Sequence, residues 1–287
     1  MKLLLTSAGI KNTSIHNALV DLLGKPIAAS SALCIPTAGY GHPTGSPDGA
    51  WRFITGQSST PMCELGWKSL GVLDLTALPS ISKERWVPWV RGADVLLVNG
   101  GDALYLCHWM HQSGLTDLLP SLDAVWVGLS AGSMVMTPSI GEDFVGWRPP
   151  TGGDRTLGLV NFSIFPHLDH PELPENTMAD AERWAAGMPV PGYAIDDQTA
   201  IKLLSVSRRA HSMYDHLSGS PPCQPEMAGP GSGRRHTTRR SRPCTVLSRV
   251  DDHCARITSP RAANAGDGGA CRCAPSRSTE THACRVC

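Results

Sequence analysis

The chain of 287 residues has no long apolar run and few aromatic residues, with Phe, Tyr and Trp together making up 6%. No stretch approaches the roughly 20 apolar residues that a membrane-spanning helix needs. The apolar start of the sequence turns polar at Thr6-Ser7, which is too early for the core of a signal peptide. We therefore expect a cytoplasmic protein without a membrane partner.

Net charge is also absent, because 25 Lys and Arg residues balance 25 Asp and Glu residues. The charges are unevenly distributed, however. Residues 1–202 contain 12 basic and 19 acidic residues, all 8 Trp and all 4 Phe, whereas residues 203–287 contain 13 Arg, no Lys, 6 acidic residues and 7 of the 10 Cys. Only the first segment has the composition to bury a core. We predict a folded domain at 1–202 and a disordered tail at 203–287.

The tail at 203–287 has three interpretations: a disordered basic arm, a metal-binding appendage, or out-of-frame translation of a GC-rich gene. We favour the last, because Ile201-Lys202 ends in the middle of a predicted strand. Resequencing the gene around codon 203 tests this hypothesis. The close cysteine pairs at 271–273 and 284–287 are too weak a signal to predict a zinc site. The arginine pairs lack interleaved aromatic residues, so nucleic acid is not an expected partner.

Within 1–202, short apolar runs alternate with amphipathic stretches, which is typical of strands and crossover helices in a mostly parallel sheet. The fold class predicted is therefore α/β, with a mostly parallel sheet flanked by helices. The expected strands are Lys2–Thr6, Ala32–Pro36, Val72–Leu75, Val95–Asn99, Ala124–Ser130, Leu159–Phe165, Gly192–Ala194 and one beginning at Thr199. The expected helices are Ser14–Leu23, Met62–Leu70, Ser82–Val90 with Ser82 as its cap, Ala103–Ser113 and Asn176–Ala186.

One motif carries a candidate nucleophile. Gly128-Leu129-Ser130-Ala131-Gly132 follows an apolar strand and precedes a helical stretch. In this context G-x-S-x-G presents the serine hydroxyl at the end of a sheet, and N–H groups at the helix start can bind a developing oxyanion. We predict Ser130 as the nucleophile. The turn Asn99-Gly100-Gly101-Asp102 ends another strand, so the N–H of Gly101 is expected to share the oxyanion with that of Ala131.

A serine nucleophile needs a base, usually a histidine that a carboxylate orients. His167 follows Phe165-Pro166 at the end of a predicted strand, at the sheet edge where Ser130 is expected. We predict His167 as the base. His170 is expected to contact substrate or to be structural, and it is the alternative base.

The carboxylate that orients the base is the least defined of the three predicted catalytic residues. Spacing alone does not single it out among the four acidic residues of the surrounding loops, which are Glu142, Asp143, Asp154 and Asp169. We predict Asp143, with Glu142 second, because the adjacent Phe144-Val145 can anchor that part of the loop. The alternative for an acidic loop residue is that it is simply solvated.

Asn-Gly-Gly-Asp at 99–102, Gly-Leu-Ser-Ala-Gly-Ser at 128–133 and Phe-Pro-His at 165–167, in this order, resemble peptidase E and the serine-peptidase family that also includes cyanophycinase. The resemblance covers roughly residues 1–202. It implies the fold of class I glutamine amidotransferases with serine at the elbow. It also implies the same roles for Ser130, His167, an acid near 142–143, and the N–H groups of Gly101 and Ala131.

Family members of the peptidase E type cleave after an N-terminal aspartate, so the resemblance implies a cation for that side chain and an anion for the free amine. Arg148 and Arg155 are candidate carboxylate ligands. Asp196 and Asp197 are candidates for holding the amine or bracing the site. Because family members continue past the equivalent of Lys202 with strand-forming sequence, the domain is expected to lack its last strand or strands.

These observations together predict a serine-type exopeptidase that hydrolyses short peptides through an acyl-enzyme, without a metal or organic cofactor. A homodimer is left open. The alternative is a non-catalytic protein of the amidotransferase-like fold that binds a small ligand in the same cleft.

Overall fold

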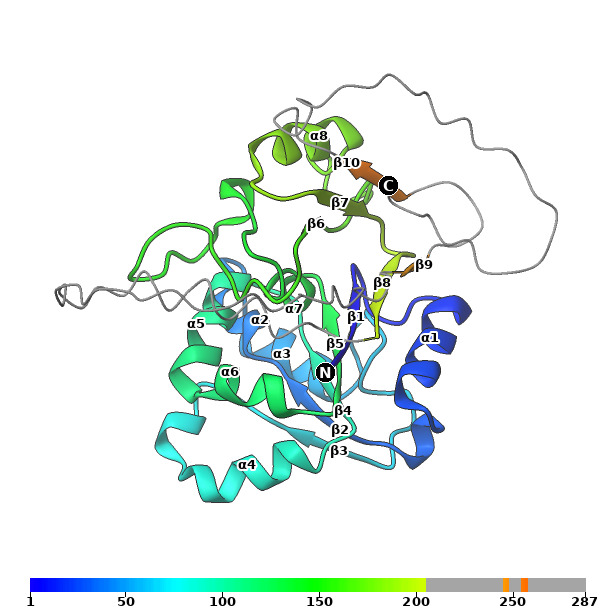
Figure 1. Cartoon of the computed structure of the whole chain (residues 1–287), viewed down its shortest axis with the longest axis vertical. Coiled ribbons are helices and arrows are strands. Elements are labelled where there is room, and N and C mark those ends of the chain that lie inside the picture. The colour runs from blue at the N-terminus through cyan, green and yellow to red at the C-terminus, as the bar shows by residue number, and fades with distance from the viewer. Residues whose placement is uncertain (205–244, 248–253, 258–287) are drawn as a thin grey trace, which may run out of the picture.

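The computed structural model describes residues 1–204, 245–247 and 254–257 (Figure 1). Its strands are β1 (Lys2–Thr6), β2 (Ser31–Ile35), β3 (Ser69–Val72), β4 (Val95–Val98), β5 (Val125–Leu129), β6 (Ser163–Phe165), β7 (Gly192–Ile195), β8 (Ala200–Leu203), β9 (Thr245–Leu247) and β10 (Cys254–Ile257). Its helices are α1 (Thr13–Leu23), α2 (Ala38–Gly41), α3 (Pro47–Ile54), α4 (Lys83–Arg91), α5 (Ala103–Ser113), α6 (Leu115–Leu118), α7 (Ala131–Met134) and α8 (Met178–Gly187).

In this part of the chain the strands form a large sheet in the order β3-β2-β4-β5-β1-β8-β9 and a small sheet in the order β10-β7-β6. The five strands from β3 to β1 run parallel, and β8 pairs antiparallel with β1. The prediction of a mostly parallel sheet flanked by helices is confirmed. Parallel pairing brings the carboxyl ends of β4, β5 and β1 to one edge, which is where an open α/β sheet places its chemistry.

The central strands are apolar because both of their faces are covered. Alternate residues point to opposite sides, so Leu3 and Leu5 of β1 join the core beneath α4, α5 and α6, while Leu4 joins the core beneath α1 and α3. Figure 1 shows α1 on one side of the large sheet and α4, α5 and α6 on the other. Trp126 in β5 is fully buried, and its indole N–H donates to the Gly132 carbonyl at 2.8 Å.

The small sheet lies beyond the carboxyl ends of the large sheet's strands, with α8 packed on it (Figure 1). Its own apolar cluster contains Phe165 and Trp184, and Phe144 packs on both rings at centroid distances of 5.2 and 6.2 Å. A capping box at Thr177 and Asp180 begins α8. This unit holds the end of β6, and therefore His167, above the sheet edge.

The sequence-based prediction of a helix at Met62–Leu70 is wrong. Gly66 has a φ of 81°, the Glu64 carboxylate accepts the N–H of Met62, and the N–H of Lys68 donates to Ser30 in front of β2. These bonds make the segment a loop. The helix in this region is α3, which the Gly- and Pro-rich sequence around it obscured. Its start does carry the expected signal, because Ser46 accepts the N–H of Gly49 and Pro47 occupies the first turn.

Two further details differ from expectation. β3 is Ser69–Val72 rather than Val72–Leu75, because Leu73 and Leu75 are buried just beyond the strand and mimic a strand pattern. Ser82 precedes α4 without capping it, since its hydroxyl bonds the Glu84 carboxylate instead. The other predicted strands and helices of residues 1–203 are present, with their ends moved by a few residues.

The tail is described only in part. β9 pairs antiparallel with β8, and β10 pairs antiparallel with β7. The expectation of a low-order tail otherwise falls on residues outside the described ranges, as do the cysteine pairs at 271–273 and 284–287. No helix within the described ranges combines the length and apolar character needed to cross a membrane.

Close packing at the elbow predicts that Gly132 cannot be replaced. An added Cβ would lie 2.5 Å from the Val98 carbonyl oxygen and 3.0 Å from that of Asn99, and neither backbone can move freely. We expect Gly132→Ala to lower the free energy of unfolding by about 1–3 kcal/mol in a urea titration. Gly187→Ala is the matched control, because nothing lies within 4 Å of its added Cβ. Equal stability of the two variants would contradict this packing.

Candidate active site

Ser130 occupies a strained turn between β5 and α7, with φ 48° and ψ −110°. Few residues other than glycine adopt a positive φ, so the surrounding bonds must hold it there. Its N–H donates to the Thr6 carbonyl at 3.0 Å, and its carbonyl accepts the N–H of Ser133 at 2.8 Å. A Cβ on Gly128 would lie 2.3 Å from the Gly132 carbonyl oxygen, so both glycines are needed to close the turn. The predicted elbow is therefore present.

The end of β1 brings the elbow and the predicted base together. Thr6 pairs in register with Leu129 of β5, so Ser7 and Ser130 leave neighbouring strands side by side. Ser7 is fully buried, and its hydroxyl accepts the main-chain N–H of His167 at 2.8 Å. One buried side chain thus joins the elbow strand pair to the loop that carries the histidine.

His167 is also strained, with a φ of 57°. The Ser7 bond holds one side of this residue, and the N–H of Leu168 donates to the Ile195 carbonyl at 3.1 Å on the other. The ring Nδ1 lies 2.7 Å from Oδ1 of Asp197. An ionised carboxylate only accepts hydrogen bonds, so Nδ1 carries the proton and Nε2 of the neutral ring is left as the acceptor. That is the tautomer a general base requires.

Asp197 is the carboxylate that the structure places on His167. Burial alone raises the pKa of Asp197, but the hydrogen bond and charge of His167, the Ser7 hydroxyl at 3.0 Å and the charge of His170 outweigh it and leave that pKa below its usual value. The neighbouring Asp196 faces a different set of groups. Its carboxylate accepts from the N–H of Gln198 and the hydroxyl of Thr199, at 3.0 and 2.6 Å, and shapes the turn before β8.

Asp143 and Glu142 do not occupy the position that the sequence analysis expects. Both are exposed, and neither hydrogen bonds to the His167 ring in the part of the chain that the structure describes. The physical reason is the single turn at Glu142–Phe144, which packs the partly buried Phe144 against the small sheet and leaves the acidic residues in solvent. The expected contact is made by Asp197 instead.

The other two acidic candidates are also placed away from His167. The Asp154 carboxylate accepts from the Ser139 hydroxyl and the N–H of Gly141, so it ties two loop segments together. Asp169 is exposed and has a φ of 54°. Ser130 and His167 are themselves not joined by a direct hydrogen bond among the described residues, which is common for a nucleophile and base without substrate.

The three predicted substrate contacts lie in different settings. Arg148 is 71% exposed and forms an ion pair with Glu142 at 3.7 Å. Arg155 is exposed and bridges to Ser139 through the backbone. His170 is partly buried, and its Nε2 lies 3.5 Å from Oδ2 of Asp197. Their roles toward a substrate stay predictions.

The two predicted oxyanion donors belong to the elbow and to the turn after β4, which lies against the elbow. Ala131 is the first residue of α7, so its N–H has no intrahelical acceptor. A Cβ on Gly100 would lie 3.4 Å from the Cβ of Ser130, which places the turn of β4 against the elbow. Gly101 has a φ of 135°, and a Cβ there would lie 2.2 Å from the Ala38 carbonyl oxygen, so only glycine fits.

Asp102 secures this turn to the loop after the elbow. It is 4% exposed, and it accepts the N–H groups of Tyr105 and Trp147 at 2.8 and 2.6 Å. Burial raises the pKa of its carboxyl, although these N–H groups oppose the rise. The Trp147 ring packs edge-on against Tyr105 at 5.4 Å. Asp102 therefore positions the loop that carries Arg148.

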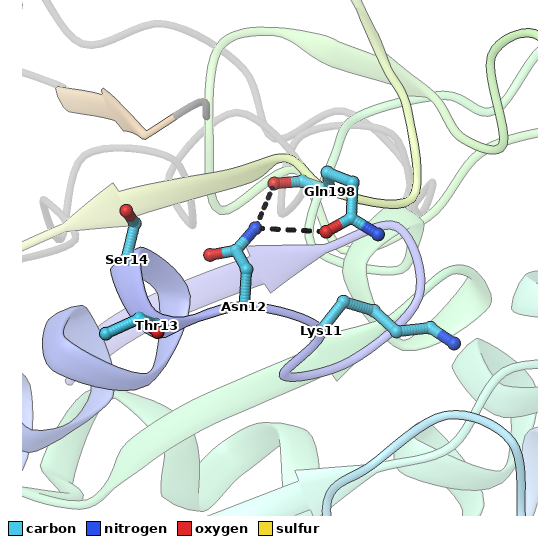
Figure 2. Close-up of a pocket in the computed structure, with 5 residues that line it drawn as sticks. All are labelled: Lys11, Asn12, Thr13, Ser14 and Gln198. Atoms are coloured by element: carbon cyan, nitrogen blue, oxygen red, sulfur yellow. Dashed lines mark hydrogen bonds between the residues drawn. The ribbon is translucent and has the colours of Figure 1, made fainter. Parts of the chain in front are cut away.

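A pocket of about 340 Å³ lies at the start of α1, next to the Asp197 turn. Figure 2 shows the Asn12 amide facing Gln198, and it donates to the Gln198 main-chain carbonyl at 2.8 Å. Ser130 and His167 do not line this pocket, so the pocket is not the candidate site. The bond between Asn12 and Gln198 instead holds the turn that follows Asp197. Among the described residues, no group of three or more His, Cys, Asp or Glu side chains is arranged to hold a metal ion.

The sequence matches the model of peptidase family S51 over residues 3–207, which is well over half of the chain. The chain belongs to peptidase family S51. Membership in S51 identifies it as a peptidase, a hydrolase of peptide bonds. No protein with a curated description matches this S51 chain.

The S51 chain also resembles two solved structures. One is a candidate peptidase E protein from Listeria monocytogenes EGD-e, with 20% identity and a TM-score of 0.49, covering 70% of this chain and 93% of that chain. The other is a peptidase from an acI-B1 Actinobacterium, with 19% identity and a TM-score of 0.51, covering 70% of this chain and 82% of that chain. At this identity, the second likeness supports the fold alone.

Sequence reasoning missed Ser7 as a site residue and named Asp197 only as a candidate for holding the substrate amine or bracing the site. Ser7 carries one usable signal, because it directly follows a central strand on the edge where reactive residues gather. The Asp196-Asp197 pair precedes β8, and a turn explains such a pair equally well. No spacing rule connects Asp197 with His167 across 30 residues.

The lowered pKa of Asp197 predicts a pH dependence of stability for this S51 protein. The unfolded chain has an aspartate pKa of about 3.9, so the ionised carboxylate stabilises the fold above that value and the effect is lost as pH falls through the lower folded-state pKa. We expect the difference in free energy of unfolding between wild type and Asp197→Asn to shrink below about pH 4. Urea titrations at several pH values measure it, and a difference that grows on acidification contradicts the prediction.

Proposed function

We propose that this chain is a serine-type exopeptidase of the dipeptidase E kind, in which Ser130 is the nucleophile, His167 the base and Asp197 the orienting carboxylate. The observation that carries the proposal is the 2.7 Å contact between Nδ1 of His167 and Asp197, which leaves Nε2 to accept a proton. The strained elbow at Ser130 supports it, because it presents the hydroxyl at the same sheet edge.

The proposed reaction proceeds through an acyl-enzyme. The Ser130 oxygen attacks the scissile carbonyl carbon while its proton moves to Nε2 of His167. The oxyanion that forms accepts hydrogen bonds from the N–H groups of Gly101 and Ala131. His167 then gives the proton to the leaving amine as the C–N bond breaks. Water repeats the sequence on the ester and restores the Ser130 hydroxyl. Asp197 stays ionised throughout and stabilises the imidazolium.

The proposed substrate is a short peptide cleaved after an N-terminal aspartate. This preference follows from the resemblance to peptidase E. Arg148 supports it as an exposed cation on the loop that Asp102 ties to the Gly101 turn. In the proposed complex its guanidinium exchanges the 3.7 Å ion pair with Glu142 for the substrate carboxylate. Exposed ion pairs contribute little to stability, so the exchange is inexpensive.

Replacing Ser130 tests the proposed nucleophile. We expect Ser130→Ala to reduce the release of p-nitroaniline from aspartyl-p-nitroanilide by at least about 10⁴-fold, because the acyl-enzyme can no longer form. Ser121→Ala, a change at an exposed serine, is the matched control and should keep full activity. Undiminished hydrolysis by Ser130→Ala would contradict the proposal. A wild type inactive on a panel of aminoacyl and dipeptidyl substrates would favour the ligand-binding alternative.

Two aspartate variants decide which carboxylate orients the base. We expect Asp197→Asn to lower kcat by about 10³–10⁴-fold, because the amide favours the wrong histidine tautomer. Asp143→Asn changes an exposed residue without a bond to His167 and should alter kcat by less than about 3-fold. Both variants are assayed alongside wild type with the same nitroanilide. The opposite ranking would restore Asp143 as the orienting acid.

A further inference from the structure

Asp197 has a second histidine on its other oxygen. Oδ1 contacts His167, whereas Oδ2 lies 3.5 Å from Nε2 of His170. The two rings are nearly perpendicular, with centroids 6.0 Å apart, and the N–H of His170 donates to the His167 carbonyl at 3.2 Å. The carboxylate is therefore clamped between two imidazoles of one tight loop.

The protonation of His170 follows from its other contact. The main-chain N–H of Glu172 donates to Nδ1 of His170 at 3.1 Å, so Nδ1 is an acceptor. In the neutral ring the proton must then reside on Nε2, which is the nitrogen that faces Asp197. Nε2 therefore directs its proton toward the Asp197 carboxylate, at 3.5 Å. Both ring nitrogens of His170 thus face groups of the protein.

We propose that His170 is a positioning residue that holds Asp197 against His167, rather than a substrate contact. This inference rests on the proposed function for its effect on turnover, but not for its effect on the His167 ring.

The ionisable groups around this clamp are few in the described structure. The groups that act on Asp197 are His167, His170 and the Ser7 hydroxyl. Asp196 is bonded within its own turn. Glu172 and Asp169, from the same loop as the histidines, are exposed. The change that follows removal of His170 should therefore pass through Asp197.

The kinetic test compares His170→Ala and His170→Gln in the full chain, with aspartyl-p-nitroanilide from pH 5 to pH 9. We expect His170→Ala to lower kcat by about 10-fold, within the range that a small misplacement of a catalytic group costs, with little change in KM. His170→Gln, whose amide N–H can replace Nε2–H, should recover most of the loss. His16→Ala, at an exposed position of α1, is the control.

A second measurement keeps the inference testable if the proposed activity fails. Proton NMR of the Nδ1–H of His167, which lies 2.7 Å from Asp197, needs no turnover, and we expect its signal to move in His170→Ala relative to wild type. In an Asp197→Asn background the same substitution should leave the signal unchanged, because Asp197 is the residue through which His170 acts. An inactive wild type that shows the expected change in this signal would overturn the proposed function and support the role of His170. A rise in KM alone, or a His167 signal insensitive to His170, would overturn that role.

Discussion

The candidate site depends on the hydrogen bonds at the carboxyl end of β1. The Thr6 carbonyl accepts from the N–H of Ser130 and from the Ser133 hydroxyl, at 3.0 and 2.8 Å, and so holds the elbow in register. One residue later, the Ser7 hydroxyl holds the main chain of His167 and the carboxylate beside it. Because Thr6 and Ser7 are both fully buried, water cannot compete for these bonds.

The same bonds explain how two strained residues persist at this edge of the sheet. Ser130 and His167 both have positive φ, a conformation that costs free energy in any residue with a Cβ. Ser130 is restrained by a bond to Thr6 at the end of β1, the strand between β5 and β8, and His167 by a bond to Ser7, the next residue. Strain at these two positions is thus offset by the pairing of the sheet. The geometry of the proposed site and the stability of the fold consequently depend on one set of contacts.

Asp197 reaches His167 through tertiary pairing. β8 runs antiparallel to β1, with Ala200 opposite Thr6, so the turn before β8 must close over the end of β1. That turn carries Asp197, and Ser7 lies directly beneath it. The sequence favoured Asp143 instead, because the adjacent Phe144-Val145 could anchor its part of the loop. Its neighbour Phe144 packs inward and leaves Asp143 in solvent.

The sequence by itself determined the local features: the central strands, the turn at Ser130 with its flanking glycines, and the position of His167 after β6. These depend on apolar runs and on residues adjacent in the chain, whose conformational preferences can be recognised without knowing their tertiary contacts. It misled at Met62–Leu70, where side-chain bonds to the loop override helical spacing. Only the tertiary structure decided which carboxylate contacts His167, because that contact depends on the antiparallel pairing of β8 with β1 and not on any local pattern.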